Sequence, residues 1–139
     1  MGMYTEIVVK INIVRKQIGS NNFNILDYMF NPNTSCTLED IIIPDDVFFK
    51  CSRWEDVGSM NSFYHHPNRV SDWYSPQFGT EDNVYIFARN DLKNYGSEIE
   101  KFFSWLNTLD LGYENDFIGY SLYEEDDIPV IYNKGIKND

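Results

Sequence analysis

The stretch that decides the fold is SEIEKFFSWLNTL, which spans residues 97–109. Its apolar side chains recur at i, i+3, i+4 and i+7, the spacing of one face of an α-helix. Those positions are Ile99, Phe102, Phe103 and Leu106. Ser97 and Glu100 have the spacing of a capping box, so we expect the helix to begin at Ser97. The positions left to face water are Glu98, Lys101, Ser104 and Asn107. The stretch therefore predicts an amphipathic helix that covers a sheet.

Alternating apolar and polar residues predict strands on both sides of this helix. We expect strands at residues 5–16, 84–89, 117–123 and 129–132, and the last two should form an antiparallel hairpin. Two more strands are expected at 47–52 and 62–66. A short helix should follow the turn at 19–22 and end before Pro32.

This order of elements predicts an α+β fold, with helices packed on one face of a mostly antiparallel sheet. An elaborated ferredoxin-like arrangement would satisfy it. The length fits one domain, 1–139, with an irregular, aromatic-rich insertion at 50–80. Residues 34–44 are interpreted as a connection that anchors Ile41, Ile42 and Ile43 in the core.

The net charge of −11 limits the classes of partner. Up to Thr80 there are 9 acidic and 6 basic residues, and beyond it 13 and 5, so the charge is concentrated in the second part. Such a surface repels nucleic-acid phosphates and anionic membranes, which disfavours direct binding to either. It attracts basic protein surfaces, including those that grip nucleic acid.

The targeting and metal signals point to a protein of the cytoplasm without a cofactor. The sequence shows neither a bilayer-spanning apolar run nor a signal peptide at its N-terminus, so we expect a cytoplasmic location. Cys36 and Cys51 are too few for a disulfide framework or a zinc knuckle. His65 and His66 are adjacent, and neighbours on a strand point to opposite faces, so a metal-dependent hydrolase at these histidines is the weakest alternative.

Two sets of residues could bind a partner or a ligand without making or breaking covalent bonds. The first is a protein interface formed by acidic side chains, namely Glu98, Asp110, Glu114, Asp116, Glu124, Glu125, Asp126 and Asp127. The second is a pocket for a nucleotide or another small molecule, in which aromatic planes and guanidinium groups hold the ligand. Its residues would be Arg53, Trp54, Tyr64, His65, Trp73 and Arg89. No activated nucleophile or phosphate-binding glycine motif is present, so an enzyme is disfavoured.

Three short stretches give the chain a family resemblance. They are Cys51-Ser52-Arg53-Trp54, residues 87–95 and Ile118-Gly119-Tyr120, the last followed by Tyr123-Glu124-Glu125. With these stretches the chain resembles small acidic proteins of unassigned activity that tailed phages and prophages encode. The resemblance implies expression in the cytoplasm of an infected bacterium, where small acidic phage proteins often bind and block a host factor.

The sequence thus favours a non-enzymatic interaction protein, a phage-encoded inhibitor of a host or defence protein that has a basic surface. Nucleic-acid mimicry is one way in which the acidic part could act. The alternative is the small-molecule binder described above. The high content of aromatic residues and the expected edge strands are also compatible with a homodimer.

Overall fold

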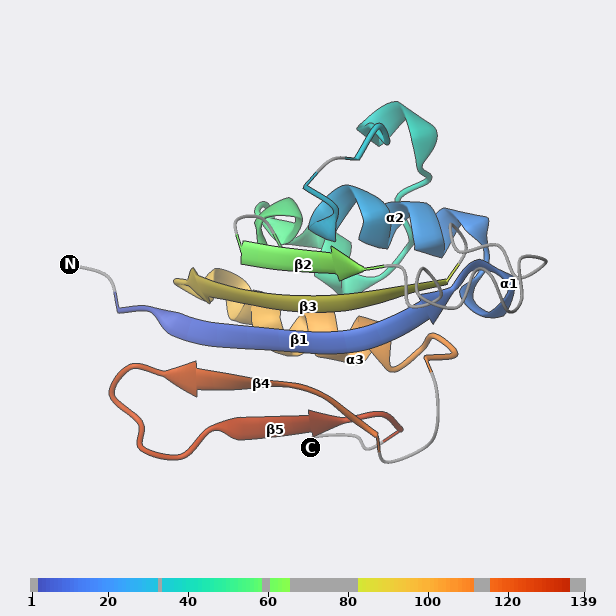
Figure 1. Ribbon diagram of the computed structural model, residues 1–139. Coiled ribbons are helices and arrows are strands. Elements are labelled where there is room, and N and C mark those ends of the chain that lie inside the picture. Colours follow the sequence, from blue (N-terminus) through green and yellow to red (C-terminus); the bar gives the residue numbers. More distant parts are fainter. Residues whose placement is uncertain (1–2, 33, 59–60, 66–82, 112–115, 136–139) are drawn as a thin grey trace.

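The sheet is built around β1 (Thr5–Val14), whose apolar residues alternate as the sequence predicts. Ile7, Val9, Ile11 and Ile13 are buried on one face. β1 pairs antiparallel with β3 (Asn83–Leu92) along its whole length, and with β4 (Phe117–Tyr123) from Thr5 to Val9. Figure 1 shows this computed structural model, which describes residues 3–32, 34–58, 61–65, 83–111 and 116–135.

Two short strands complete the sheet. β2 (Asn61–His65) pairs with β3, and β5 (Val130–Asn133) pairs with β4, so the strand order is β2-β3-β1-β4-β5 with antiparallel neighbours throughout. The predicted hairpin at the C-terminal end is confirmed, and so is the α+β class with a mostly antiparallel sheet.

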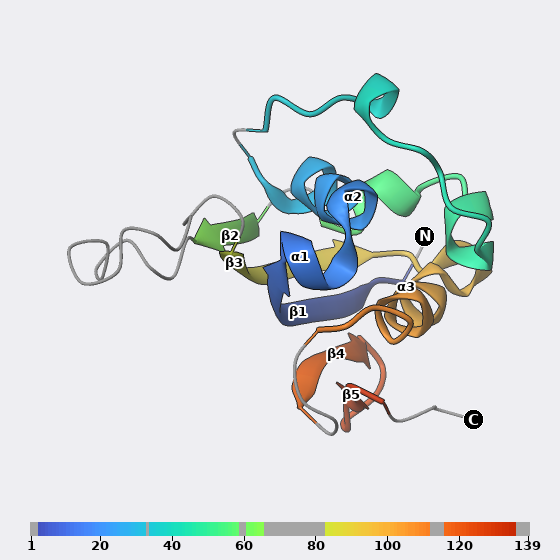
Figure 2. The ribbon, with the colours of Figure 1, turned by 90° about the vertical axis from the view of Figure 1, so that its right-hand side faces the viewer.

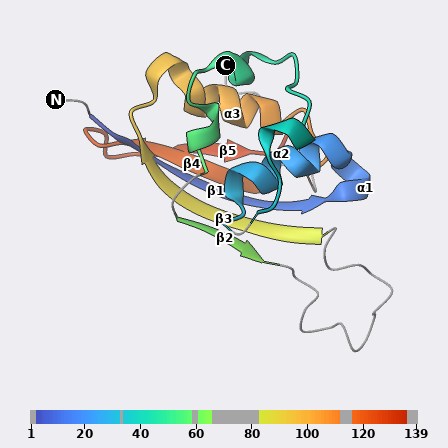
Figure 3. The same cartoon turned by 90° about the horizontal axis from the view of Figure 1, so that it is seen from above.

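The helices cover one face of this sheet. They are α1 (Arg15–Ile18), α2 (Ser20–Phe30) and α3 (Glu98–Leu106). Figures 2 and 3 show α2 and α3 on the same side of the strands. The other face of β3 is open, since Tyr85 and Phe87 are each about half exposed.

The aromatic side chains of α3 contact both the C-terminal hairpin and the rings around Phe48 within one core. The four apolar positions predicted for its buried face are all buried, and Trp105 is buried with them. Phe102 packs on Phe48, with 5.3 Å between the ring centroids. Phe103 stacks on Tyr132 of β5 at 4.0 Å, with the ring planes 8° apart. The helix therefore fastens the hairpin to the rest of the protein.

Gly119 of β4 allows Phe103 to reach the sheet. A Cβ at this position would lie 2.2 Å from the carbonyl oxygen of Val8 and 2.6 Å from the Phe103 ring. Those separations are far below van der Waals contact, so only glycine fits. The pairing of β4 with β5 is irregular at the same place, between Phe117 and Gly119.

The cap of α3 differs from the predicted capping box. Ser97 has a left-handed backbone (φ 59°), and its side chain accepts no capping hydrogen bond. The side-chain oxygen of Asn94 accepts from the amide of Ile99 at 2.8 Å, and its Nδ2 donates to Glu100 at 3.0 Å. Asn94 therefore caps the helix, because the chain turns sharply through Gly96 and Ser97 before α3 begins.

Three further expectations about exposure and local structure are wrong. Residues predicted as a strand at 47–52 form a 3₁₀-helix, η2 (Val47–Lys50), which buries Phe48 and Phe49 on neighbouring positions. Only Ile41 of the three adjacent isoleucines is buried. Glu98, expected to face water, is 2% exposed. Other short 3₁₀-helices in the described ranges are η1 (Leu38–Asp40), η3 (Trp54–Asp56) and η5 (Tyr95–Ser97). Most of the predicted insertion, residues 66–80, lies outside the described residues.

We predict that Asn94→Ala lowers the free energy of unfolding by about 1–2 kcal/mol, because the first turn of α3 loses its cap. Ser97→Ala should leave it within about 0.5 kcal/mol, because the serine side chain forms no capping bond. Urea unfolding of the two variants measures both changes. A larger loss for Ser97→Ala than for Asn94→Ala would contradict this assignment of the cap.

Candidate functional site

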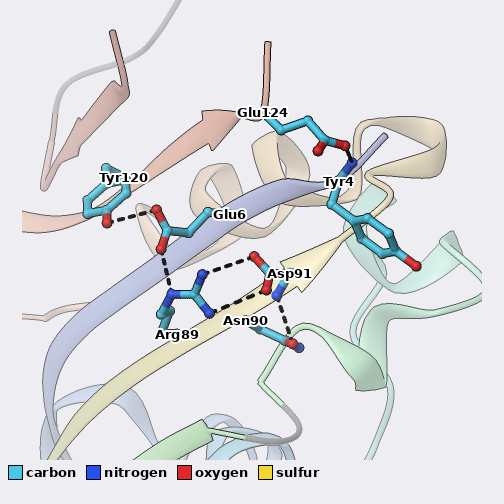
Figure 4. Close-up of polar contacts among 7 residues, drawn as sticks. All are labelled: Tyr4, Glu6, Arg89, Asn90, Asp91, Tyr120 and Glu124. Atoms are coloured by element: carbon cyan, nitrogen blue, oxygen red, sulfur yellow. Dashed lines mark hydrogen bonds and ion pairs between the residues drawn. The ribbon is translucent and has the colours of Figure 1, made fainter. Parts of the chain in front are cut away.

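An open depression of about 470 Å³ lies where the ends of β1, β3 and β4 meet. Figure 4 shows the polar residues around it. Its lining comes from three separate parts of the chain and consists of Tyr4, Glu6, Arg89, Asp91, Leu122, Tyr123, Glu124 and Asp126. Four carboxylates and one guanidinium line the depression, so it carries an excess of negative charge.

Ion pairs fix the floor of this depression. The Nε of Arg89 donates to Glu6 at 2.5 Å, and its two terminal nitrogens donate to Asp91 at 3.2 and 3.3 Å. These contacts raise the pKa of Arg89 above its ordinary value, first through the hydrogen bond to Glu6 and then through the charge of Asp91. The single cation of the lining is thus already paired with two carboxylates.

Tyr120 links β4 to the ion pair between Glu6 and Arg89. Its hydroxyl donates to Glu6 at 3.1 Å. Burial, followed by this hydrogen bond and the charge of Glu6, raises the pKa of Tyr120. Glu6 is therefore held from two strands, by Arg89 of β3 and by Tyr120 of β4 (Figure 4).

The rim is formed by the turn between β4 and β5. The amide of Tyr4 donates to the side chain of Glu124 at 2.6 Å, and the amide of Glu124 donates to the carbonyl oxygen of Tyr4 at 3.1 Å. Partial burial and the charges of Glu125, Glu124 and Asp126 raise the pKa of Tyr123. The turn is therefore fastened to the N-terminal strand, with its carboxylates exposed to solvent.

The predicted interface acids do not form one surface. Glu124, Glu125, Asp126 and Asp127 are exposed together on the turn. Asp116 precedes β4 whereas Glu124 follows it, so the length of this seven-residue strand, about 20 Å, separates them. Asp110 and Asp116 are exposed, Glu98 is buried, and Glu114 lies outside the described residues. Only the turn contributes to the depression, through Glu124 and Asp126.

The residues predicted for a small-molecule pocket are not brought together. Trp54 is buried on the helix side of the sheet, where its ring meets those of Phe48 and Phe49. The guanidinium of Arg53 lies over the ring of Tyr95 at 5.2 Å. Arg89 lies on the open face, in the ion pairs above. The structure describes only the backbone of Tyr64 and His65, and Trp73 lies outside the described residues.

Sequence reasoning missed Tyr4, Glu6 and Asp91 as site residues. Glu6 looks like an ordinary polar position of an alternating strand. It becomes part of a site because the register of β1 and β3 places it opposite Asp91 and beside Arg89. The sequence carries the alternation but not the register between strands 80 residues apart, so no local signal marks these residues.

Glu98 forms a second unusual feature, at the start of α3. Its Oε1 is buried and has no hydrogen-bond partner among the described residues. Burial raises the pKa of this carboxyl, the charge of Arg53 lowers it and the charge of Asp56 raises it. Since the charged form is buried without a full set of partners, it costs folding free energy at neutral pH.

Neither metal ligands nor membrane spans are found where the structure describes the chain. No three His, Cys, Asp or Glu side chains gather there as ligands of a metal ion. None of the helices in these ranges has both the length and the apolarity to cross a bilayer. Comparison with known proteins finds no family model, no curated protein and no solved structure that matches the chain.

We predict that Glu98→Gln raises the free energy of unfolding by about 1 kcal/mol at pH 7, because it removes a buried negative charge. The folded-state pKa of Glu98 is raised, so the wild type is destabilised above this pKa. The cost disappears as the pH falls below the ordinary carboxyl pKa of the unfolded chain.

Urea unfolding at pH 7 and pH 4 tests this, with the exposed Glu125→Gln as the matched control. The advantage of Glu98→Gln should shrink at the lower pH, whereas Glu125→Gln should change little at either. A Glu98→Gln protein less stable than the wild type at pH 7 would show that the carboxylate is well paired.

Proposed function

We propose that this protein is a non-enzymatic interaction protein that binds a basic surface of another protein through the acidic depression and the turn at 124–127. One observation carries this proposal: the acidic turn is fastened by two hydrogen bonds to the N-terminal strand, beside a depression with four carboxylates. Anchored charges lose little conformational entropy when a partner binds, which favours recognition.

The chemistry of the rim supports contact with a protein. Tyr4 and Tyr123 flank the carboxylates and are partly exposed. Tyrosine is enriched in protein interfaces, where its ring excludes water and its hydroxyl bonds with the partner. The overall charge of −11 adds long-range attraction toward a cationic partner.

We further propose that the partner is a host or defence protein in the cytoplasm of a bacterium and that the chain is a phage-encoded inhibitor. The resemblance to small acidic phage proteins supports a phage origin and a location in the cytoplasm of an infected bacterium. The acidic excess supports a target whose basic surface normally holds nucleic acid, in which case the carboxylates would stand in for phosphates.

For the fold, we propose an elaborated ferredoxin-like arrangement. Its support is the strand order β2-β3-β1-β4, antiparallel between neighbours, with the helices on one face and β5 added beside β4. This arrangement carries no functional conclusion by itself.

The alternative, a nucleotide or small-molecule binder, has less support. Arg89 is paired with two carboxylates, so an anionic ligand would have to displace them. Trp54 is enclosed by other aromatic rings, so it offers no free face for stacking.

We predict that reversing the charges at 124–127 to lysine strongly weakens the salt-sensitive binding of the partner. Immobilised wild-type protein should capture the partner from lysogenic or infected bacteria, for identification by mass spectrometry. Its affinity should then fall steeply with salt, because the attraction is between exposed charges.

The isosteric variant with Gln and Asn at 124–127 is the matched control. It removes half as much charge as the reversal, so the increase in log Kd should be about half as large. Equal losses for both variants, or binding that is insensitive to salt, would contradict an electrostatic interface.

A further inference from the structure

The segment from η1 to the first residue of η2 exposes an unusual set of apolar side chains. Within ten successive residues, those that are about half exposed or more are Leu38, Ile42, Ile43 and Val47. Ile42 is 77% exposed. Single exposed apolar residues are ordinary, but four within one short segment are not. We call residues 37–47 the Ile42 loop.

Hydrogen bonds hold the Ile42 loop in a defined shape. The side chain of Asn21 in α2 donates to the carbonyl oxygen of Ile42 at 2.8 Å and accepts from the amide of Ile42 at 2.7 Å. Asp40 accepts from the amide of Thr37 at 2.8 Å, and Asp46 accepts from the amide of Phe48 at 2.9 Å. The exposure of Ile42 is therefore part of a fastened conformation.

Buried neighbours anchor the loop on either side of the exposed residues. Ile41 is 8% exposed, and Phe48 at the start of η2 is fully buried. Phe48 stacks against Trp105 of α3, with 6.0 Å between the ring centroids. A partner that covers Ile42 and Ile43 would thus bury apolar area with little ordering of the backbone.

The charge of the Ile42 loop selects the kind of partner. It contains four acids and no base, the acids being Glu39, Asp40, Asp45 and Asp46. Lys50, in η2, lies 3.8 Å from Asp45 on the exposed surface. This charge repels nucleic acid and anionic lipid, and it also repels a second copy of the same loop. A surface that is both basic and apolar is complementary to it.

We propose that the Ile42 loop is a second docking surface, which binds a basic amphipathic helix of a partner protein. Apolar side chains of that helix cover Ile42 and Ile43, and its lysines or arginines face the four acids. Figure 1 shows the segment after α2 at the top of the view, beyond α2, and the β4–β5 hairpin at the bottom, at the other edge of the sheet. This surface is therefore separate from the acidic turn. Protection at residues 37–47, as opposed to 124–127, distinguishes its occupation from the function proposed above.

The test uses a fluorescent synthetic helix of leucine and lysine with amphipathic spacing. Fluorescence anisotropy should show binding to the wild type, and Ile42→Ser with Ile43→Ser should weaken it about tenfold. The matched control is Ile128→Ser, at an isoleucine that is 80% exposed and lies beside the acidic turn. It should change the affinity less than about twofold.

Two further measurements complete the test. A helix of the same pattern with glutamate in place of lysine should not bind, because like charges repel. Amide hydrogen exchange should show new protection in residues 37–47 when the leucine–lysine helix is bound. The inference is overturned by absent binding, by equal binding of the glutamate helix, by protection confined to other residues, or by the same affinity for the Ile42/Ile43 and Ile128 variants.

Discussion

The rest of the structure depends on the contact of Phe103 with the sheet at Gly119. The missing side chain at Gly119 lets the ring lie against β4, where it also stacks on Tyr132 of β5. On its other side α3 meets the aromatic rings around Phe48. One helix therefore fixes both the C-terminal hairpin, which carries the acidic turn, and the segment that follows the Ile42 loop.

The two faces of the sheet carry different kinds of side chain. On the helix side, apolar and aromatic side chains supply the core. On the open side, Glu6 and Asp91 hold Arg89 in place, and the acidic turn closes the rim. The negative surface is thus built on paired strands and on a turn that is hydrogen-bonded to the residue before β1.

Local patterns predicted the parts of the fold that depend on local periodicity. The bounds of β4 and the buried face of α3 follow from periods of two and 3.6 residues. The cap at Asn94 could not be found this way, because it depends on left-handed backbone at Ser97. Three successive isoleucines have no period, so the sequence did not show that Ile42 is exposed. The acidic depression needs the register of strands far apart in the chain.

Native-state hydrogen exchange on Gly119→Ala tests the central claim most directly. The added methyl group would overlap the Phe103 ring and the carbonyl oxygen of Val8, so the hairpin should separate more readily from α3 and from β1. We expect the amides of β4 and β5 to exchange at least about tenfold faster than in the wild type. The matched variant Gly19→Ala also places alanine at a positive φ (88°), which strains the backbone between α1 and α2, but nothing lies within 4 Å of its new Cβ. It should leave the hairpin amides protected. Unchanged protection of β4 and β5 in Gly119→Ala would contradict the account.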